Sequence, residues 1–151
     1  MNSYRLEFDG SCSKNPGGTC AFGFVIIRKD CVFACNTETI IKEGHGVYGT
    51  GPGMTNNCSE HIAVIKGLSA IMEFIESGDS LEIVGDSMLI INQLNGVWGA
   101  RSNSGYYKFY HLSKRALKDI RQKGVTVTCR WIGRDQNQRA DELSKFHNKN
   151  K

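Results

Sequence analysis

Four carboxylates stand where the sequence is expected to change from strand to helix. Asp9 follows an alternating apolar segment and precedes a run of small residues, and Asp86 follows the short apolar segment 81–85. Glu60 and Asp141 lie near the starts of two expected helices. Four acids brought together would repel one another unless cations neutralised them, and oxygen ligands select Mg²⁺ or Mn²⁺ rather than zinc. Such a cage can hold two metals about 4 Å apart, one activating water and one stabilising a leaving oxygen.

Each acid also has a structural interpretation. Asp86 could cap its helix, Glu60 could complete a capping box with Asn57, and Asp141 could be a solvated helix residue. Taken singly, these interpretations are the simpler ones for those three acids. Asp9 is harder to explain in this way, because an acid between an apolar strand and a small-residue turn has little structural use. The residues alone therefore predict a candidate metal site and nothing more specific.

The elements that would position these acids can be predicted from periodicity and turn signals. Residues 4–9 alternate as a strand that ends near Asp9, and residues 21–28 and 32–41 predict two strands joined by a tight turn at residues 29–30. Residues 42–53 are rich in glycine and predict a loop. Thr55, Asn56 and Asn57 then supply caps for a long helix, with Glu60 in its first turn and Gly78 as its end.

The second half of the chain predicts a strand over 81–85, helices over 86–94 and 106–123, a strand over 125–131 and a helix over 137–146. This order predicts an α/β domain with a five-stranded mixed sheet flanked by helices, the two later strands parallel to the first. Strand ends and helix starts meet at one crevice of such a sheet, so the four acids should converge there. We expect one domain over 1–148 and a polar tail over 149–151.

The composition is that of a single globular domain, with 151 residues, 40% of them hydrophobic and 23% charged. No apolar segment approaches the ~20 residues of a membrane span, and the first residues lack a secretory signal pattern, so we expect a cytoplasmic protein without membrane association. The six cysteines include no Cys-x-x-Cys pair. Most of them are therefore expected to be small buried residues, not zinc ligands or disulfides.

Positive charge gathers in residues 101–124, which hold seven basic residues and one acid in a chain whose net charge is +4. In the expected helix, Lys114, Lys118 and Arg121 recur at spacings of four and three and so share a face. Such a face could bind a polyanion, or it could simply be solvated. Charge alone favours neither interpretation.

Four segments resemble the motifs of the type 1 ribonuclease H family, in the family's order. They are Asp9-Gly10-Ser11-Cys12-Ser13-Lys14-Asn15-Pro16-Gly17-Gly18, Thr55-Asn56-Asn57-Cys58-Ser59-Glu60, Gly85-Asp86-Ser87 with Asn92-Gln93-Leu94-Asn95-Gly96, and Asn137-Gln138-Arg139-Ala140-Asp141-Glu142-Leu143-Ser144. With the elements between them they span residues 4–146. The resemblance implies a ribonuclease H-like fold and a metal-binding catalytic set made of Asp9, Glu60, Asp86 and Asp141.

The same resemblance implies substrate contacts. Gly10, Ser11, Asn56 and Asn57 would touch the minor groove of an RNA–DNA hybrid, where 2′-hydroxyl groups distinguish RNA from DNA. Asn15 and Thr55 would hold a phosphate of the DNA strand, and amide and hydroxyl groups can do so without adding charge near the metals. We further predict that Lys114, Lys118 and Arg121 contact phosphates away from the cut.

The implied activity is endonucleolytic hydrolysis of the RNA strand of RNA–DNA hybrids by a monomer with two Mg²⁺ ions, or Mn²⁺ as a substitute, leaving 5′-phosphate and 3′-hydroxyl ends. One alternative is a catalytically idle hybrid- or RNA-binding module on the same fold, although pure binding has no use for a repulsive acidic cluster. Another is a different nuclease of this fold, such as an exonuclease or a junction resolvase.

The chain departs from the family's pattern at three points. Bacterial members often carry a basic protrusion between the third and fourth motifs, for which this chain is too short. Position 88, often polar in relatives, is Met88, and residues 132–140 lack the histidine that many relatives place before the last acid. His147 lies beyond that motif. The pattern is similar to compact forms from archaea, some bacteria and retroelements, and it predicts activity that rises into alkaline pH without a histidine-dependent step.

Overall fold

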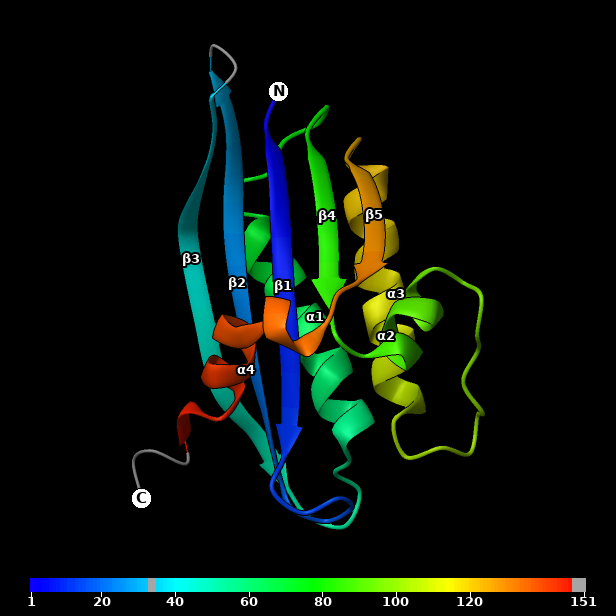
Figure 1. Cartoon of the computed structure of the whole chain (residues 1–151). Coiled ribbons are helices and arrows are strands. Elements are labelled where there is room, and N and C mark those ends of the chain that lie inside the picture. The colour runs from blue at the N-terminus through cyan, green and yellow to red at the C-terminus, as the bar shows by residue number, and fades with distance from the viewer. Residues whose placement is uncertain (33–34, 148–151) are drawn as a thin grey trace.

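One five-stranded sheet runs through the protein in the order β3-β2-β1-β4-β5 (Figure 1). The computed structural model describes residues 1–32 and 35–147. The strands are β1 (Ser3–Cys12), β2 (Thr19–Val32), β3 (Cys35–Thr50), β4 (Ser80–Gly85) and β5 (Thr126–Trp131). β1 pairs antiparallel with β2 and parallel with β4, and β5 pairs parallel with β4. The predicted mixed sheet, with both later strands parallel to the first, is confirmed.

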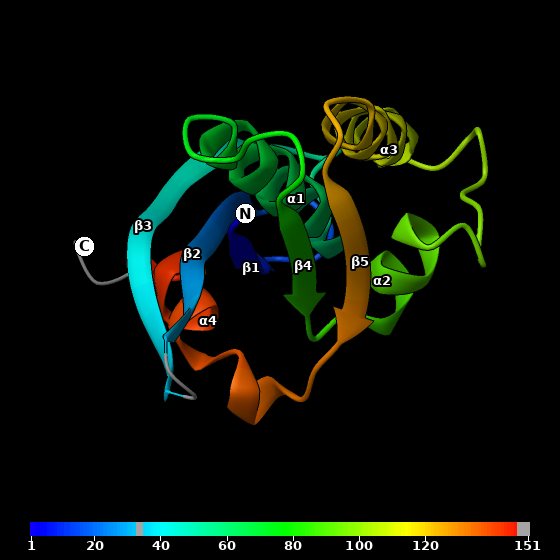
Figure 2. The same cartoon turned by 90° about the horizontal axis from the view of Figure 1, so that it is seen from above.

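Helices cover both faces of this sheet, as the view from above shows (Figure 2). They are α1 (Asn56–Ile71), α2 (Met88–Leu94), α3 (Tyr107–Gln122) and α4 (Gln138–Ser144), with a 3₁₀ turn, η1 (Arg134–Gln136), before α4. In the view of Figure 1, α1 and α3 lie behind the sheet and α4 lies in front of β1 and β2. The main core fills the space between the sheet and α1, where Leu6, Ile83 and Leu68 are almost fully buried. Of the four free cysteines whose burial the structure describes, Cys20 and Cys58 are buried, as predicted, whereas Cys12 and Cys129 are half-buried.

The hairpin of β2 and β3 is longer than predicted. The expected tight turn at residues 29–30 is wrong, because Lys29 pairs with Glu38 and Asp30 with Thr37, and the pairing continues to Val32 and Cys35. The loop expected over 42–53 is also wrong for most of its length, because β3 continues to Thr50.

Two glycines of that segment serve packing in β3 and not chain reversal. A Cβ at Gly44 would lie 2.2 Å from Cζ of Phe24, and a Cβ at Gly46 would lie 3.0 Å from Cζ of Phe22. Each phenylalanine is the direct cross-strand partner of its glycine. The aromatic rings therefore occupy the space that side chains on β3 would need.

Other boundaries differ by a few residues, and three of the differences concern the acids. β1 continues to Cys12, so Asp9 lies inside the strand, paired with Gly23, and not at its end. Glu60 is the fifth residue of α1, beyond the first turn, and α2 begins at Met88 rather than at Asp86. α1 ends at Ile71, before the predicted stop at Gly78. The polar tail predicted over 149–151 lies outside the described residues.

A buried polar network ties α1, α2 and α3 together behind the sheet. The imidazole of His61 contacts Ser113 Oγ through Nδ1 at 2.7 Å and Gln93 Oε1 through Nε2 at 2.8 Å. Gln93 Nε2 in turn donates to the carbonyl of Gly99 at 3.1 Å and to the hydroxyl of Tyr106 at 3.0 Å. These bonds fix the loop between α2 and α3 to the helix that carries Glu60.

Replacing His61 with Leu should cost about 1–3 kcal/mol of unfolding free energy at pH 7, because Gln93 Oε1 is left buried without a donor. Burial lowers the pKa of His61 to about 4, partly offset by the bond to Gln93, so the folded protein holds the neutral ring. Neutral His61 therefore contributes to the unfolding free energy of the wild-type protein above pH 6.5, and this contribution is lost as the pH falls towards 4. The penalty measured by chemical denaturation should therefore shrink at pH 4.5. A matched His111→Leu change, at an exposed position, should shift stability by less than about 0.5 kcal/mol, and an equal loss in both variants would contradict this account.

Candidate metal centre

Three carboxylates converge at one end of the sheet. Asp9 on β1, Glu60 on α1 and Asp86 after β4 each place an oxygen within 4.8 Å of the other two. The parallel register pairs Glu7 with Val84, so the chain positions two residues further on, Asp9 and Asp86, emerge side by side. The predicted convergence of these three acids is confirmed.

Gly10 is the residue that lets α1 approach β1 closely enough to bring Glu60 to Asp9. A Cβ on Gly10 would lie 2.3 Å from the carbonyl carbon of Ser59 and 2.4 Å from the backbone nitrogen of Glu60. Real Cβ atoms do not approach backbone atoms that closely. The absence of a side chain at Gly10 therefore has a positional role that sequence reasoning missed when it assigned this residue to substrate contact alone.

Asp141 reaches the same pocket from α4 on the other face of the sheet. The pocket has a volume of about 420 Å³ and is lined by all four predicted acids. Asn137 anchors α4 beside Asp9 by donating from Nδ2 to the carbonyl of Phe8 at 2.9 Å, and Gly23 leaves room for the helix backbone. Asp141 is not part of the tight group of three, and its Oδ1 accepts a bond from Lys145 Nζ at 2.9 Å.

The electrostatics of the pocket favour protonation of its inner acids. Burial and the charge of Asp86 raise the pKa of Asp9 to about 7, although Ser144 Oγ donates to its Oδ2 at 3.0 Å. Burial, followed by the charges of Asp9 and Asp86, raises the pKa of Glu60 well above its usual value. Burial also raises the pKa of Asp86, against the opposing effect of Arg134.

Asp141 behaves in the opposite way. Burial alone would raise its pKa, but hydrogen bonds with Lys145 and Asp9 outweigh burial and hold the pKa below its ordinary value. Asp141 is therefore ionised under conditions in which Asp9 still binds a proton. The pocket thus has three inner acids whose pKa values are raised and one acid at its rim whose pKa is lowered.

The donor set fits a divalent cation. Glu60 Oε2 is buried without a hydrogen-bond partner, which costs free energy unless something else binds it. The basic groups beside the acids lie at the rim: Arg134 Nε is 3.8 Å from Asp86 Oδ2 with its side chain 86% exposed, and Lys145 Nζ is 2.9 Å from Asp141 Oδ1. Carboxylate oxygens grouped around an unneutralised centre are the ligands that hard divalent ions prefer.

The structure also decides two of the alternative interpretations. Asp86 does not cap α2, because Ser87 is the N-cap and its Oγ accepts from the backbone N–H of Ile90. Glu60 takes no part in a capping box with Asn57, because Thr55 is the N-cap of α1 and accepts from the N–H of Cys58. Both purely structural roles are therefore wrong.

Four of the nine predicted substrate-contacting residues border the acids. Gly10, Ser11, Asn56 and Asn57 line the acid pocket. The hydroxyl of Ser11 donates to the carbonyl of Ser144 at 2.6 Å, so this residue also fastens α4 to β1. Arg134 also lines the pocket. Sequence reasoning did not single out three further lining residues, Cys12, Ser87 and Lys145, or Ser144, whose hydroxyl donates to Asp9. Of these four, Cys12, Ser87 and Ser144 lay within the quoted motifs.

The remaining predicted contacts divide into two groups. Asn15 and Thr55 stand together at the start of α1, where Asn15 Oδ1 accepts from the backbone N–H of Asn56 at 3.2 Å. Lys114, Lys118 and Arg121 do not line the acid pocket, and they lie instead along a separate groove on α3.

The sheet order, the helices on its two faces and the acids within β1 and directly after β4 define a ribonuclease H-like fold. Residues 7–147 match the family described as "Reverse transcriptase-like", and the chain belongs to this family. The type 1 ribonuclease H resemblance of the motifs is thereby confirmed.

Two curated relatives illustrate the family. Ribonuclease HI of Halobacterium salinarum is 36% identical over 91 residues, which are 60% of this chain and 39% of that protein. Ribonuclease H of Syntrophus aciditrophicus is 28% identical over 147 residues, 91% of this chain and 75% of that protein. The match thus spans about two fifths of the Halobacterium relative's length.

Solved structures agree on the fold. Ribonuclease H1 of Halobacterium salinarum superposes with a TM-score of 0.78 at 26% identity, covering 99% of both chains. The N-terminal ribonuclease H domain of a Mycobacterium tuberculosis protein gives a TM-score of 0.77 at 25% identity, covering 97% of this chain and 93% of that one. LC11-RNase H1 in complex with an RNA/DNA hybrid gives a TM-score of 0.67 at 25% identity, covering 93% of this chain and 92% of that one. Among the described residues no helix has the length and apolar character needed to cross a bilayer.

Substituting Gly10 with Ala should separate α1 from β1, because the new Cβ would meet backbone and not a flexible side chain. We expect a loss of about 1–3 kcal/mol in unfolding free energy, typical of overpacking, and a weaker affinity for Mn²⁺ in calorimetric titration. Gly53→Ala is the matched control, since a Cβ there meets nothing within 4 Å. Unchanged Mn²⁺ affinity in a folded Gly10→Ala protein would show that the close approach does not position Glu60.

Substituting Asp9 with Asn should stabilise the protein in chelator by on the order of 1 kcal/mol, because one charge leaves the repulsive cluster. The pKa of Asp9 is raised to about 7, so the wild-type penalty is absent at low pH and develops as the pH rises through 7. The gain should therefore be larger at pH 8 than at pH 5. Thermal unfolding at both pH values, with the exposed Glu76→Gln as control, measures it, and a variant that is less stable at pH 8 would contradict the repulsion.

Proposed function

We propose that this protein is an endoribonuclease that hydrolyses the RNA strand of RNA–DNA hybrids with bound Mg²⁺, for which Mn²⁺ can substitute. The observation that carries the proposal is the convergence of Asp9, Glu60 and Asp86 in a pocket that Asn56 and Asn57 also line. A binding module would gain nothing from an acidic group that repels phosphates. Relatives named ribonuclease H and a structural neighbour in complex with an RNA/DNA hybrid support this choice.

In the proposed mechanism Asp9, Glu60 and Asp86 hold the cations, and Asp141 contributes from the rim. Bound divalent cations in such sites activate the attacking water and stabilise the leaving oxygen. The side chain of Arg134 extends into solvent beside Asp86, where its guanidinium can steady the leaving phosphate. The close approach of α1 to β1 at Gly10 places the carboxylates of Asp9 and Glu60 next to each other.

Recognition of the hybrid is assigned to the neutral groups beside the acids. Asn56 and Asn57 can exchange hydrogen bonds with 2′-hydroxyl and sugar oxygens without adding charge to the pocket. Asn15 uses its Oδ1 to hold the N–H of Asn56, which leaves its amide N–H groups for a DNA phosphate. Since the site is built by one chain, we propose that the protein acts as a monomer, and we expect it in the cytoplasm.

A cleavage panel tests the proposal. End-labelled RNA–DNA hybrid, RNA duplex and DNA duplex are incubated with Mg²⁺ or with chelator, using wild type and Asp9→Asn. We expect cuts within the RNA strand of the hybrid, with 5′-phosphate products, only for wild type with Mg²⁺. Binding without cleavage would favour the idle binding module, and cleavage that prefers DNA duplex or strand ends would favour another nuclease of this fold.

The raised pKa of Asp9, about 7, means that protons compete with the cation for the site below neutral pH. The Mg²⁺ concentration for half-maximal cleavage should therefore fall about tenfold between pH 6 and pH 8. At saturating Mg²⁺, activity should rise into alkaline pH with no histidine-dependent step, since no histidine is among the described residues that line the pocket. His147→Ala should reproduce both curves. A neutral step that disappears in that variant would place His147 in the reaction.

A further inference from the structure

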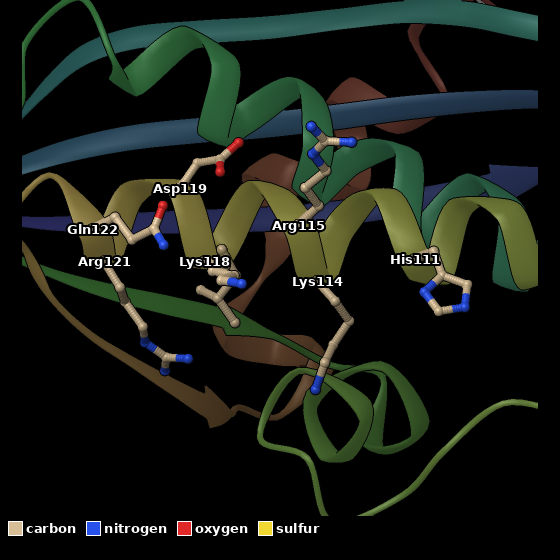
Figure 3. Close-up of a pocket in the computed structure, with 8 residues that line it drawn as sticks. His111, Lys114, Arg115, Lys118, Asp119, Arg121 and Gln122 are labelled. Carbon is tan, nitrogen blue, oxygen red and sulfur yellow. The ribbon is translucent and has the colours of Figure 1, made fainter.

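The outer side of α3 carries an open groove of about 860 Å³ that is lined by basic side chains (Figure 3). Lys114 and Arg121 point from α3 towards α2 and β5. Asp119, the one acid that lines the groove, and Arg115 point to the opposite side of the helix. The groove therefore holds four cations and one carboxylate, and that carboxylate points away from Lys114 and Arg121.

These cations differ from the other basic groups of the protein. Arginines and lysines on the sheet and on α4 mostly pair with acids, as Arg5 does with Glu38 at 2.6 Å and Arg139 with Glu43 at 2.6 Å. Within residues 1–32 and 35–147, no ion pair joins a basic side chain of α3 to an acid. An uncompensated row of cations produces a local positive potential that attracts a polyanion.

Two of the cations are also held in place. Lys114 Nζ donates to the carbonyl of Gln93 at 3.0 Å, and Arg121 Nη2 donates to the carbonyl of Val127 at 3.1 Å. A carbonyl fixes the direction of the side chain and leaves its full charge available. Less side-chain entropy is then lost when an anion binds to these two cations.

The row of cations formed by Lys114, Lys118 and Arg121 begins one short helix away from the acid pocket. Lys114 contacts Gln93 near the end of α2, and Ser87, the N-cap of α2, lines the acid pocket. α2 has seven residues and is therefore about 10 Å long. From Lys114 to Arg121 α3 rises by about another 10 Å, and a nucleic acid strand places a phosphate roughly every 3.4 Å along its axis. The row thus matches about three phosphates, several base pairs from the acids.

We propose that Lys114, Lys118 and Arg121 bind the phosphate backbone of the hybrid duplex several base pairs away from the cleavage site. The identity of the ligand as a hybrid rests on the proposed function. A duplex fits better than a single strand, because the described residues lining the groove include no Phe, Tyr or Trp on which free bases could stack. The groove lengthens the footprint on the hybrid and raises affinity without taking part in the chemistry.

The test replaces all three cations with Gln and measures cleavage of hybrids of about 20 and about 8 base pairs, because only the longer one can reach the far end of the row. On the long hybrid KM should rise by about tenfold or more with kcat unchanged, and on the short hybrid KM should change little. In anisotropy titrations of the long hybrid in chelator, the slope of log affinity against log salt should flatten by about 0.9 for each lost contact.

Two control variants separate specific contact from net charge and from folding. Lys29, Lys42 and Lys66, replaced together by Gln, remove the same charge from other surfaces and should leave KM and the salt slope near wild type. A charge-retaining triple variant, Lys114→Arg, Lys118→Arg and Arg121→Lys, should bind the long hybrid more tightly than the Gln triple variant at these positions.

Equal effects of the two Gln triples, equal effects on both hybrid lengths, or an unchanged salt slope would each overturn the groove proposal. A groove that serves an acidic protein would give the unchanged slope. Failure of the proposed function looks different: wild type would cleave neither hybrid, while anisotropy would still report whether the groove binds the long duplex. Thermal unfolding of each triple confirms that the compared proteins are folded.

Discussion

The close approach of α1 to β1 at Gly10 is the contact on which the rest of the site depends. Because Gly10 carries no Cβ, the backbone of Ser59 and Glu60 lies where a side chain would otherwise stand. Glu60 therefore meets Asp9, and the parallel pairing of β1 with β4 adds Asp86 to the group. α4, anchored by the bond from Asn137 to β1, completes the pocket with Asp141.

This geometry opposes folding electrostatically, and the surrounding structure has to offset it. Three carboxylates within 4.8 Å can be tolerated either by binding protons, which is why the pKa values of Asp9 and Glu60 rise, or by binding a cation. Both ring nitrogens of His61, the residue after Glu60, take part in hydrogen bonds. The unpaired Glu60 Oε2 is by contrast a buried group that a ligand would satisfy. The hydrogen-bonded network of His61 thus stabilises the helix that carries Glu60, whose Oε2 atom lacks a partner.

Much of this could be predicted from the sequence, because periodicity reports which side of an element is buried. The strands and helices, their order and the convergence of Asp9, Glu60 and Asp86 all followed from local patterns and motif order. The extension of β3 through Gly44 and Gly46 could not, since it depends on phenylalanine rings of the neighbouring strand. Likewise, the role of Gly10 requires the position of α1. Spacing alone placed Lys114, Lys118 and Arg121 on one face but could not show that this face lacks acidic partners.

The central claim is that the three inner acids form a repulsive group that a divalent cation relieves. Thermal unfolding of the wild-type protein in chelator and in Mg²⁺, at pH 5 and pH 8, tests it most directly. The account predicts that Mg²⁺ raises Tm, and by more at pH 8, where Asp9, with its pKa near 7, has ionised. An identical Tm with and without Mg²⁺ at pH 8, in a protein with all its acids intact, would contradict the account.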